Sequence, residues 1–252
     1  MQIKQTIILW VSALIITFLT GYLESIFSSD YPITGTIGIN GQQVSYKFDK
    51  IFRGKDGYTV LIRTDLQDLK GILKWQNEDN KFIWNSVQMI SGDGILHAEI
   101  PKQSPKTIAE YEVKLIWEDS TYTLPQCKIQ FLGEVPRMIM FLFYFSLLGG
   151  LLFSIRTGLE YFNENQKIKK LSLFTVTFFF VLAIAVNPLK KSYELEAINK
   201  SVPNITALFD YQSLLLLFIW VVGMVIVFKL KNPKPAVLIL SIITILIFFL
   251  IS

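Results

Sequence analysis

Five apolar stretches without charged residues dominate this chain and limit what it can fold into. Each is 18 or 19 residues long and contains no Asp, Glu, Lys or Arg. A charged side chain at mid-membrane costs at least about 2.5 kcal/mol, so uncharged windows of this length predict membrane-spanning helices. The stretches are 6–23, 138–155, 171–189, 211–228 and 235–252. We therefore expect an α-helical integral membrane protein with five transmembrane helices.

The expected spans lack the ionisable residues that commonly mark pumps, proton relays and ion pathways. This absence disfavours a transporter or channel. The sequence also shows no internal repeat, so an inverted-repeat transporter has no support.

The net charge of +4 is unevenly distributed, and the distribution predicts a topology. Residues 24–134 carry 12 Lys/Arg and 15 Asp/Glu, whereas the rest of the chain carries 12 and 5. The basic residues flank the spans and form no patch interleaved with aromatic residues, so we expect membrane lipid and no nucleic acid as a partner. Short loops on the N-terminal side hold eight Lys/Arg against three in the opposite loop. The positive-inside rule then places the N-terminus in the cytoplasm and residues 24–134 outside.

The first apolar stretch has two interpretations, an uncleaved anchor or a signal peptide with Lys4 in its basic region. Its apolar run is long for a signal peptide, and no cleavage site with small residues stands out near Thr20 or Gly21. We expect an anchor helix. The domains are then a transmembrane anchor at 1–23, an exported domain at 24–134 and a four-helix transmembrane domain at 135–252.

The exported domain shows the alternation of apolar and polar residues that is typical of β-strands. Such runs occur at 33–39, 42–48, 58–63, 71–75, 81–89, 94–100, 108–117 and 121–131, with turns expected at 91–94 and 118–120. Asn40-Gly41 predicts a type I′ hairpin turn between the first two runs, because both residues tolerate positive φ. Seven or eight short strands in about 100 residues favour an all-β sandwich. We expect its core to contain Trp75, Trp84, Tyr111 and Trp117.

The exported domain resembles bacterial immunoglobulin/fibronectin-III-like modules. The residues that carry the resemblance are Leu73, Trp75, Trp84, Val87, Met89, Gly92-Asp93-Gly94, Ala98-Glu99-Ile100-Pro101 and Glu110-Tyr111. Trp75 and Glu110 depart from the pattern, which often has Tyr at these places. The resemblance implies an immunoglobulin-like sandwich inserted between the first two transmembrane helices and implies no ligand.

The whole chain also resembles an uncharacterised family of bacterial inner-membrane proteins. The residues that carry this resemblance are Gly35-Thr36-Ile37-Gly38, Val44-Ser45-Tyr46-Lys47-Phe48, Gly133, Val135-Pro136 and Arg156-Thr157-Gly158-Leu159-Glu160. It implies a multi-pass protein of the bacterial inner membrane with a periplasmic domain, and no particular chemistry.

Two features of the later helices lead to local predictions. We expect the second helix to continue past the membrane through 156–170, with Arg156 and Glu160 four residues apart on one face. Asn187-Pro188 is expected to break the end of the third span.

No group of residues predicts chemistry, so we expect no enzyme, no catalytic residue, no cofactor and no metal. His97 is the only histidine, and the Gly-x-Ser-x-Gly motif of a nucleophile elbow is absent. Cys127 is the only cysteine, which excludes an intramolecular disulfide, and we expect it to be a small buried side chain. Acidic pairs are expected to be solvated turn residues, with weak calcium binding as the alternative. These pairs are Asp65/Asp68, Glu78/Asp79 and Glu118/Asp119.

Small residues in the spans predict close helix packing. Packing within this chain is the first interpretation, and contact with the helix of another membrane-protein subunit is the alternative. The residues are Gly149, Gly150, Ser154, Gly158 and Gly223.

Three classes of function remain open. We expect a non-catalytic membrane subunit or scaffold whose exported sandwich docks a partner protein or an envelope ligand. A small transporter or channel is the first alternative, and a membrane enzyme without a recognisable site is the second. Fold alone does not decide among them.

Overall fold

The computed structural model describes residues 2–78, 83–164, 167–196 and 204–250. These residues form two compact units. The helical unit contains the described residues of 1–29, 135–193 and 200–252. The β unit contains the described residues of 30–134, together with residues 194–196 from the segment after the third span.

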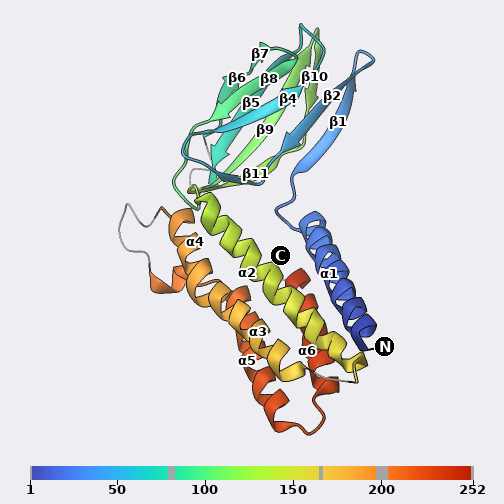
Figure 1. Ribbon diagram of the computed structural model, residues 1–252. Coiled ribbons are helices and arrows are strands. Elements are labelled where there is room, and N and C mark those ends of the chain that lie inside the picture. The colour runs from blue at the N-terminus through green and yellow to red at the C-terminus, as the bar shows by residue number, and fades with distance from the viewer. Residues whose placement is uncertain (1, 79–82, 165–166, 197–203, 251–252) are drawn as a thin grey trace. The chain divides into compact units, whose positions relative to one another are not determined.

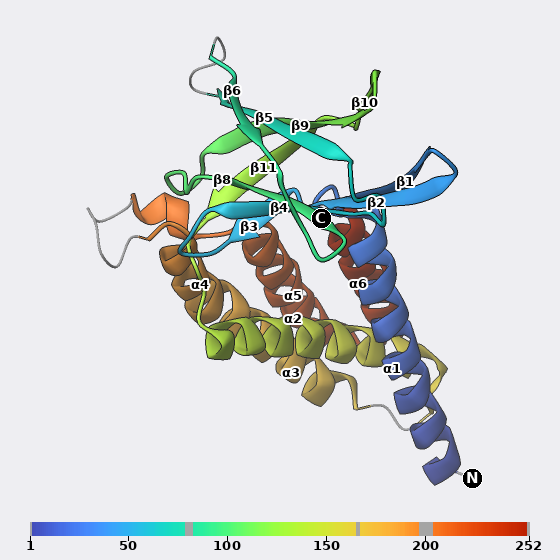
Figure 2. The same ribbon diagram turned by 90° about the horizontal axis from the view of Figure 1, so that it is seen from above.

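The β unit is a sandwich of two sheets, drawn in Figure 1 and seen as two layers in Figure 2. The first sheet has the order β1 (Ile33–Ile39), β2 (Gln42–Phe48), β4 (Tyr58–Arg63), β8 (Ile95–Ile100) and β7 (Ile90–Gly92). The second has the order β3 (Ile51–Arg53), β11 (Cys127–Leu132), β9 (Ile108–Trp117), β5 (Lys70–Asn77) and β6 (Asn85–Gln88). A further strand, β10 (Ser120–Thr123), pairs with β9.

The expected strands agree with those observed, except that the expected run 81–89 is shortened to β6 (Asn85–Gln88), with residues 81–82 outside the described part of the chain. The hairpin between β1 and β2 is confirmed, since Asn40 and Gly41 have φ values of 48° and 76°. Two short strands, β3 and β7, were not expected. The run 121–131 is divided into β10 and β11 because Pro125 lies between them and cannot donate a ladder hydrogen bond.

Alternate side chains of both sheets fill one core. The fully buried members include Phe48, Leu73, Tyr111 and Ile129. Of the expected aromatic core, Tyr111 is confirmed as buried, while Trp75 and Trp117 are partly buried against the core. The prediction for Trp84 is wrong, since its side chain is 40% exposed. Trp84 comes before the first residue of β6, so strand alternation does not turn it inward.

Two buried tyrosines bind the backbone where the chain crosses from the first sheet to the second. The crossing lies between β2 and β3, at Asp49 and Lys50. The Asp49 N–H donates to the hydroxyl oxygen of Tyr58 at 3.0 Å, and the Tyr111 hydroxyl donates to the Asp49 carbonyl at 3.3 Å. The Lys50 carbonyl accepts from the N–H of Gln130 at 2.8 Å. Where the chain crosses between the sheets, its backbone N–H and C=O groups leave the regular ladder of inter-strand hydrogen bonds, so they need other partners.

We predict that Tyr111→Phe destabilises the sandwich by about 1–3 kcal/mol, because the Asp49 carbonyl loses a buried donor. Cys127 is buried and is the only cysteine of the chain, so its reaction with a thiol reagent in increasing urea reports unfolding of this unit. The midpoint should fall for Tyr111→Phe in the full chain. It should hardly move for Tyr122→Phe on β10, and equal shifts in both variants would contradict the role of the hydroxyl.

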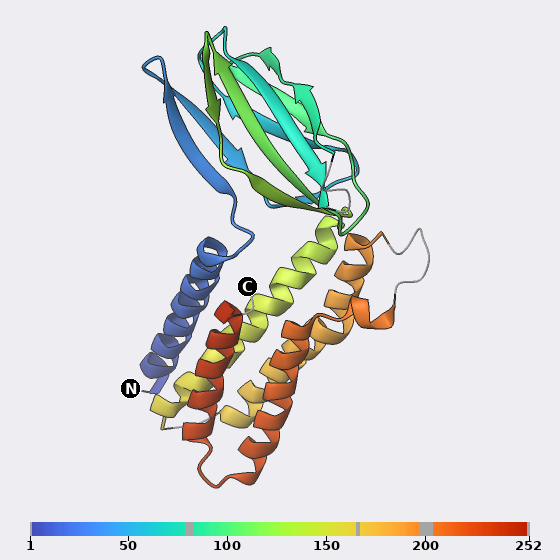
Figure 3. The same cartoon turned by 180° about the vertical axis from the view of Figure 1, so that it is seen from behind.

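The helical unit contains five helical runs, which Figure 3 shows side by side. They are α1 (Gln2–Phe27), α2 (Arg137–Gly158) with the 3₁₀ turn η2 (Leu159–Phe162), the continuous run of α3 (Ile168–Phe180), η3 (Val181–Val186) and α4 (Asn187–Glu194), α5 (Tyr211–Lys229), and α6 (Lys234–Leu250). A short 3₁₀ turn, η4 (Ile205–Leu208), precedes α5. Trp220 of α5 is fully buried, and its indole N–H donates to Thr244 of α6 at 2.8 Å.

Four of the five runs are long and apolar enough to cross a membrane. The fifth, α6, has 17 described residues, which span about 26 Å, against about 30 Å for the hydrocarbon core. The expectation of five equivalent spans is therefore met by four helices and one shorter apolar helix. Residues 251–252, the end of the expected fifth span, lie outside the described part of the chain.

Two predictions about helix ends are wrong. The third span does not break at Asn187-Pro188 but continues to Glu194. In a regular α-helix the ring of Pro188 would clash with the carbonyl of residue 184, and the wider π-helical turn over Val181–Val186 relieves this clash. The second helix, in contrast, is α-helical only to Gly158 and continues as the 3₁₀ turn η2 to Phe162, so it does not extend to residue 170. Residues 165–166 of the expected range 156–170 lie outside the described part of the chain.

Candidate docking site

The exposed edge of the sandwich, residues 83–92, is its most apolar surface. We call this segment the open edge. It starts before β6, continues through β7 and passes from the second sheet to the first. The exposed side chains of Ile83, Trp84, Val87 and Ile90 have 57%, 40%, 41% and 64% of their area accessible. Buried Met89 holds the middle of the segment against the core.

The open edge lacks the usual protection of an edge strand. Its ten residues include no charged residue and no proline. Natural sheets commonly place lysine, proline or a covering loop at such an edge to prevent pairing with another chain. Within the described residues, β6 pairs with β5 alone and β7 with β8 alone. Figure 1 shows both strands on the same flank of the sandwich.

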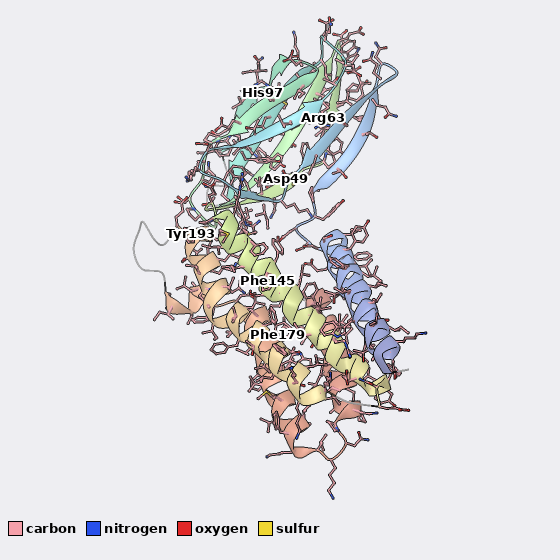
Figure 4. The ribbon with its side chains drawn as sticks, in the orientation of Figure 1. Asp49, Arg63, His97, Phe145, Phe179 and Tyr193 are labelled. Atoms are coloured by element: carbon pink, nitrogen blue, oxygen red, sulfur yellow. The ribbon has the colours of Figure 1, made fainter. Side chains whose placement is uncertain are left out.

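His97 lies beside the open edge on the outer face of the first sheet. It is half-buried, in register with Leu61 of β4 on one side and Ile90 of β7 on the other. Leu96 and Ala98 face the core, so strand alternation turns His97 outward. Figure 4 labels His97 and Arg63 on this sheet. The imidazole of His97 therefore belongs to the outer surface of the sandwich and not to its core.

Two shallow hollows flank Arg63 on the same outer face. One, of about 320 Å³, lies between β2 and β4 and includes Lys47, Asp49 and Thr59 in its lining. The other, of about 360 Å³, includes Asp65 and Asp93. Their linings mix cations, carboxylates and hydroxyls, and this mixture selects no single class of ligand.

The buried cluster of Tyr58, Tyr111 and Cys127 has a structural role. Burial raises the pKa of both tyrosine hydroxyls and of the Cys127 thiol above their ordinary values. All three groups contact the Asp49 backbone, with Sγ of Cys127 3.9 Å from its carbonyl oxygen. The thiol therefore stays protonated near neutral pH, the opposite of what a nucleophilic cysteine requires.

The acidic pairs of the sequence do not assemble into larger clusters in the described ranges. No group of three or more His, Cys, Asp or Glu side chains suitable for a metal ion occurs among the residues that the structure describes. Asp79, half of one expected pair, lies outside those residues. A calcium site has no support from this arrangement.

The small residues of the spans lie against helices of the same chain. A β-carbon on Gly149 or Gly150 would meet the rings of Phe178 and Phe179. A β-carbon on Gly158 would meet Ser241 of α6, and one on Gly223 would meet Leu240. Ser154 is fully buried. These contacts are intrachain packing, and Phe179 is labelled in Figure 4.

An open hollow of about 360 Å³ lies between α1 and α2. Its lining includes Leu14, Phe18, Tyr144 and Gly149 and is almost wholly apolar. An apolar hollow between two helices long enough to cross a membrane fits lipid hydrocarbon as well as an apolar side chain, so it does not single out a partner.

A buried ion pair closes the end of α2, where the sequence predicted a helix that continues past the membrane with Arg156 and Glu160 on one face. Arg156 and Glu160 are 2% and 0% exposed, and Nη1 of Arg156 lies 2.7 Å from Oε1 of Glu160. The guanidinium also lies over the Trp10 ring of α1, 5.4 Å from its centroid. The i, i+4 spacing predicted the pair, but nothing in the spacing indicated burial.

Glu160 binds the turn that follows α2. Its carboxylate accepts from the Asn163 side chain at 3.0 and 3.2 Å and from the Lys167 N–H at 2.9 Å. The side chain of Gln5 in α1 donates to the carbonyl of Phe162 at 2.8 Å. These bonds satisfy backbone groups at the helix end, which explains why the helix does not continue.

We predict that Arg156→Met lowers the stability of the helical unit by about 3–5 kcal/mol, because Glu160 keeps a buried charge without its cation. The double variant Arg156→Met/Glu160→Gln should recover most of this loss, since the amide oxygen still accepts from Asn163 and Lys167. The measurement is the fraction of full chain that stays monodisperse in detergent after heating. Exposed Lys231→Met is the control, and a double variant as unstable as the single one would contradict this account.

Comparison with known proteins gives one weak structural match. A solved structure described as a bromine derivative of BhCBM56 covers 41% of this chain and 95% of its own, with 12% identity and a TM-score of 0.25. No protein-family model and no curated protein matches the chain.

Proposed function

We propose that this protein is a non-catalytic membrane subunit or scaffold whose sandwich docks a partner protein. The observation that carries the proposal is the open edge, with Trp84, Val87 and Ile90 exposed on an uncharged segment. An apolar segment of this kind beside a polar surface is typical of a protein-binding site. Exposed tryptophan is also the residue type most enriched among binding hot spots.

The order of strands supports an immunoglobulin-like assignment of the sandwich. β4, β8 and β7 correspond to strands B, E and D, and β11, β9, β5 and β6 correspond to G, F, C and C′. The chain switches sheets between β2 and β3, and β3 then pairs in parallel with β11. Immunoglobulin-like modules commonly bind other proteins, although the fold alone does not establish that function.

A location in the bacterial inner membrane with the N-terminus in the cytoplasm belongs to the same proposal. The unequal number of basic residues in the short loops supports it. The β unit gives a second argument, since Glu194 and Glu196 from the segment after the third span bind Arg53 and Lys102 of the sandwich at 3.3 and 2.8 Å. These ion pairs support a topology in which the sandwich and that segment lie on the same side of the membrane.

We predict that a membrane-impermeant maleimide labels Ser91→Cys in intact cells and does not label Lys231→Cys. Both positions are exposed, and they belong to segments expected on opposite sides. The parent chain is the blank, because Cys127 is buried. Opening the cells should make Lys231→Cys reactive. The reverse pattern would overturn the orientation.

A transporter is the second candidate, and one observation favours it. Ionisable residues buried in a helical membrane unit are often functional, and Arg156 and Glu160 are such residues. Their mutual pairing and the bonds of Glu160 to Asn163 and Lys167 favour a structural role instead.

We predict that the full chain, purified from native membranes in mild detergent, retains a stoichiometric partner. Trp84→Ala should lower recovery of that partner at least about tenfold, because a buried interface tryptophan contributes about 2 kcal/mol or more. Leu61→Ala is the matched control, since Leu61 is 47% exposed on the outer face of the same sandwich. Recovery of a lone monomer, with solute flux in reconstituted vesicles, would replace the subunit proposal by transport.

A further inference from the structure

We propose that the partner binds by adding an extended strand of its own to β6. This inference rests on the proposed function and specifies its mode. Strand addition uses main-chain hydrogen bonds for affinity and alternate side-chain contacts for specificity. The sandwich must therefore have an edge strand whose N–H and C=O groups point away from its neighbour, next to an apolar surface.

The register of β6 shows which backbone groups point outward. β5 and β6 are antiparallel, with Leu73 opposite Val87 and Lys74 opposite Ser86. The Met89 N–H donates to the Gly71 carbonyl at 2.8 Å. Hydrogen-bonded and non-hydrogen-bonded pairs alternate in such a ladder, so the pair of Leu73 and Val87 is also hydrogen-bonded.

Ser86 and Gln88 then direct their N–H and C=O groups away from β5. Both residues are exposed, and β6 has no second neighbour among the described strands. An added strand would pair with these groups in place of water. The spacing of two residues matches the period of a β-ladder.

The side chains of β6 define the kind of strand that fits. Val87 faces the core side with Leu73 but remains 41% exposed, because no strand lies beyond it. Ser86 and Gln88 lie on the opposite, polar side. An apolar side chain opposite Val87 would complete the flank of the core, so the partner strand should alternate apolar and polar residues.

β1 is the edge strand of the first sheet opposite to β7, and its side chains are less exposed than those of β6. β1 pairs with β2 alone among the described strands, and it too is uncharged. Its apolar residues Ile33 and Ile37, however, are partly buried against the core, and no large apolar side chain of β1 is exposed. The combination of outward backbone groups with exposed Trp84 and Val87 therefore favours β6.

The test uses a photocrosslinking amino acid, benzoylphenylalanine, in place of Asn85, an exposed residue of β6 next to Trp84, in the full chain in native membranes. Ser86→Pro removes an outward N–H without removing a bond to β5, so it should lower the yield of the crosslinked partner at least about tenfold. Ser86→Ala keeps the N–H and should leave the yield unchanged. Protection of Cys127 from a thiol reagent verifies that each variant is folded.

Each result decides the question. A crosslinked protein that is lost in folded Ser86→Pro and kept in Ser86→Ala supports strand addition. A crosslink that survives Ser86→Pro overturns strand addition and leaves the proposed subunit function intact. A product with twice the mass of this chain identifies a second copy as the occupant and overturns a separate partner.

Two further outcomes separate the inference from the proposed function. If no crosslink forms and purification also yields a lone monomer, the proposed function itself fails. If Ser86→Pro exposes Cys127, Gln88→Pro takes its place, because its N–H also points outward. Unfolding of both variants would mean that these N–H groups are needed inside the sandwich, which overturns the inference.

Discussion

Polar groups that leave water must find partners within the protein, and this requirement organises both units. A buried donor or acceptor without a partner costs about 1–3 kcal/mol, and more in hydrocarbon. In the helical unit, the hydroxyls of Thr17 and Thr175 donate to backbone carbonyls four residues earlier, and Trp220 donates to Thr244. In the sandwich, Tyr58 and Tyr111 do the same for the backbone of the sheet crossing.

The end of α2 is the strongest case of this requirement. A carboxylate that leaves water needs a cation and hydrogen-bond donors, and Glu160 has Arg156, Asn163 and the Lys167 N–H. The missing side chain of Gly158, two residues earlier, lets Ser241 of α6 approach closely. Glu160 thus holds the turn that follows α2 and η2.

The open edge differs because its backbone groups face water and need no partner within the protein. Ser86 and Gln88 are exposed, so hydration satisfies them in the free state. On binding, the backbone of another strand replaces that water, and the apolar side chains of Trp84 and Val87 are removed from solvent. Such an edge is stable in the free protein. It favours a partner strand whose apolar and polar residues alternate as those of β6 do.

The sequence by itself determined the features that depend on local pattern. Uncharged apolar runs predicted the helices, alternation predicted β1, β2, β4 and β9, and Asn40-Gly41 predicted their first hairpin. Each of these follows from a period or a turn preference that a few neighbouring residues carry.

Only the tertiary structure decided the features that depend on residues distant in sequence. The exposure of Trp84, the burial of Arg156 and Glu160, and the continuation of the third span through Pro188 could not be predicted from local pattern. An aromatic residue is buried only if another element covers it, and Trp84 precedes β6, which has no second neighbour among the described strands. A charged pair is buried only where other elements cover it, and the guanidinium of Arg156 lies over the Trp10 ring of the distant helix α1. Burial depends on what packs against a residue, and the residue's own sequence neighbours do not contain that information.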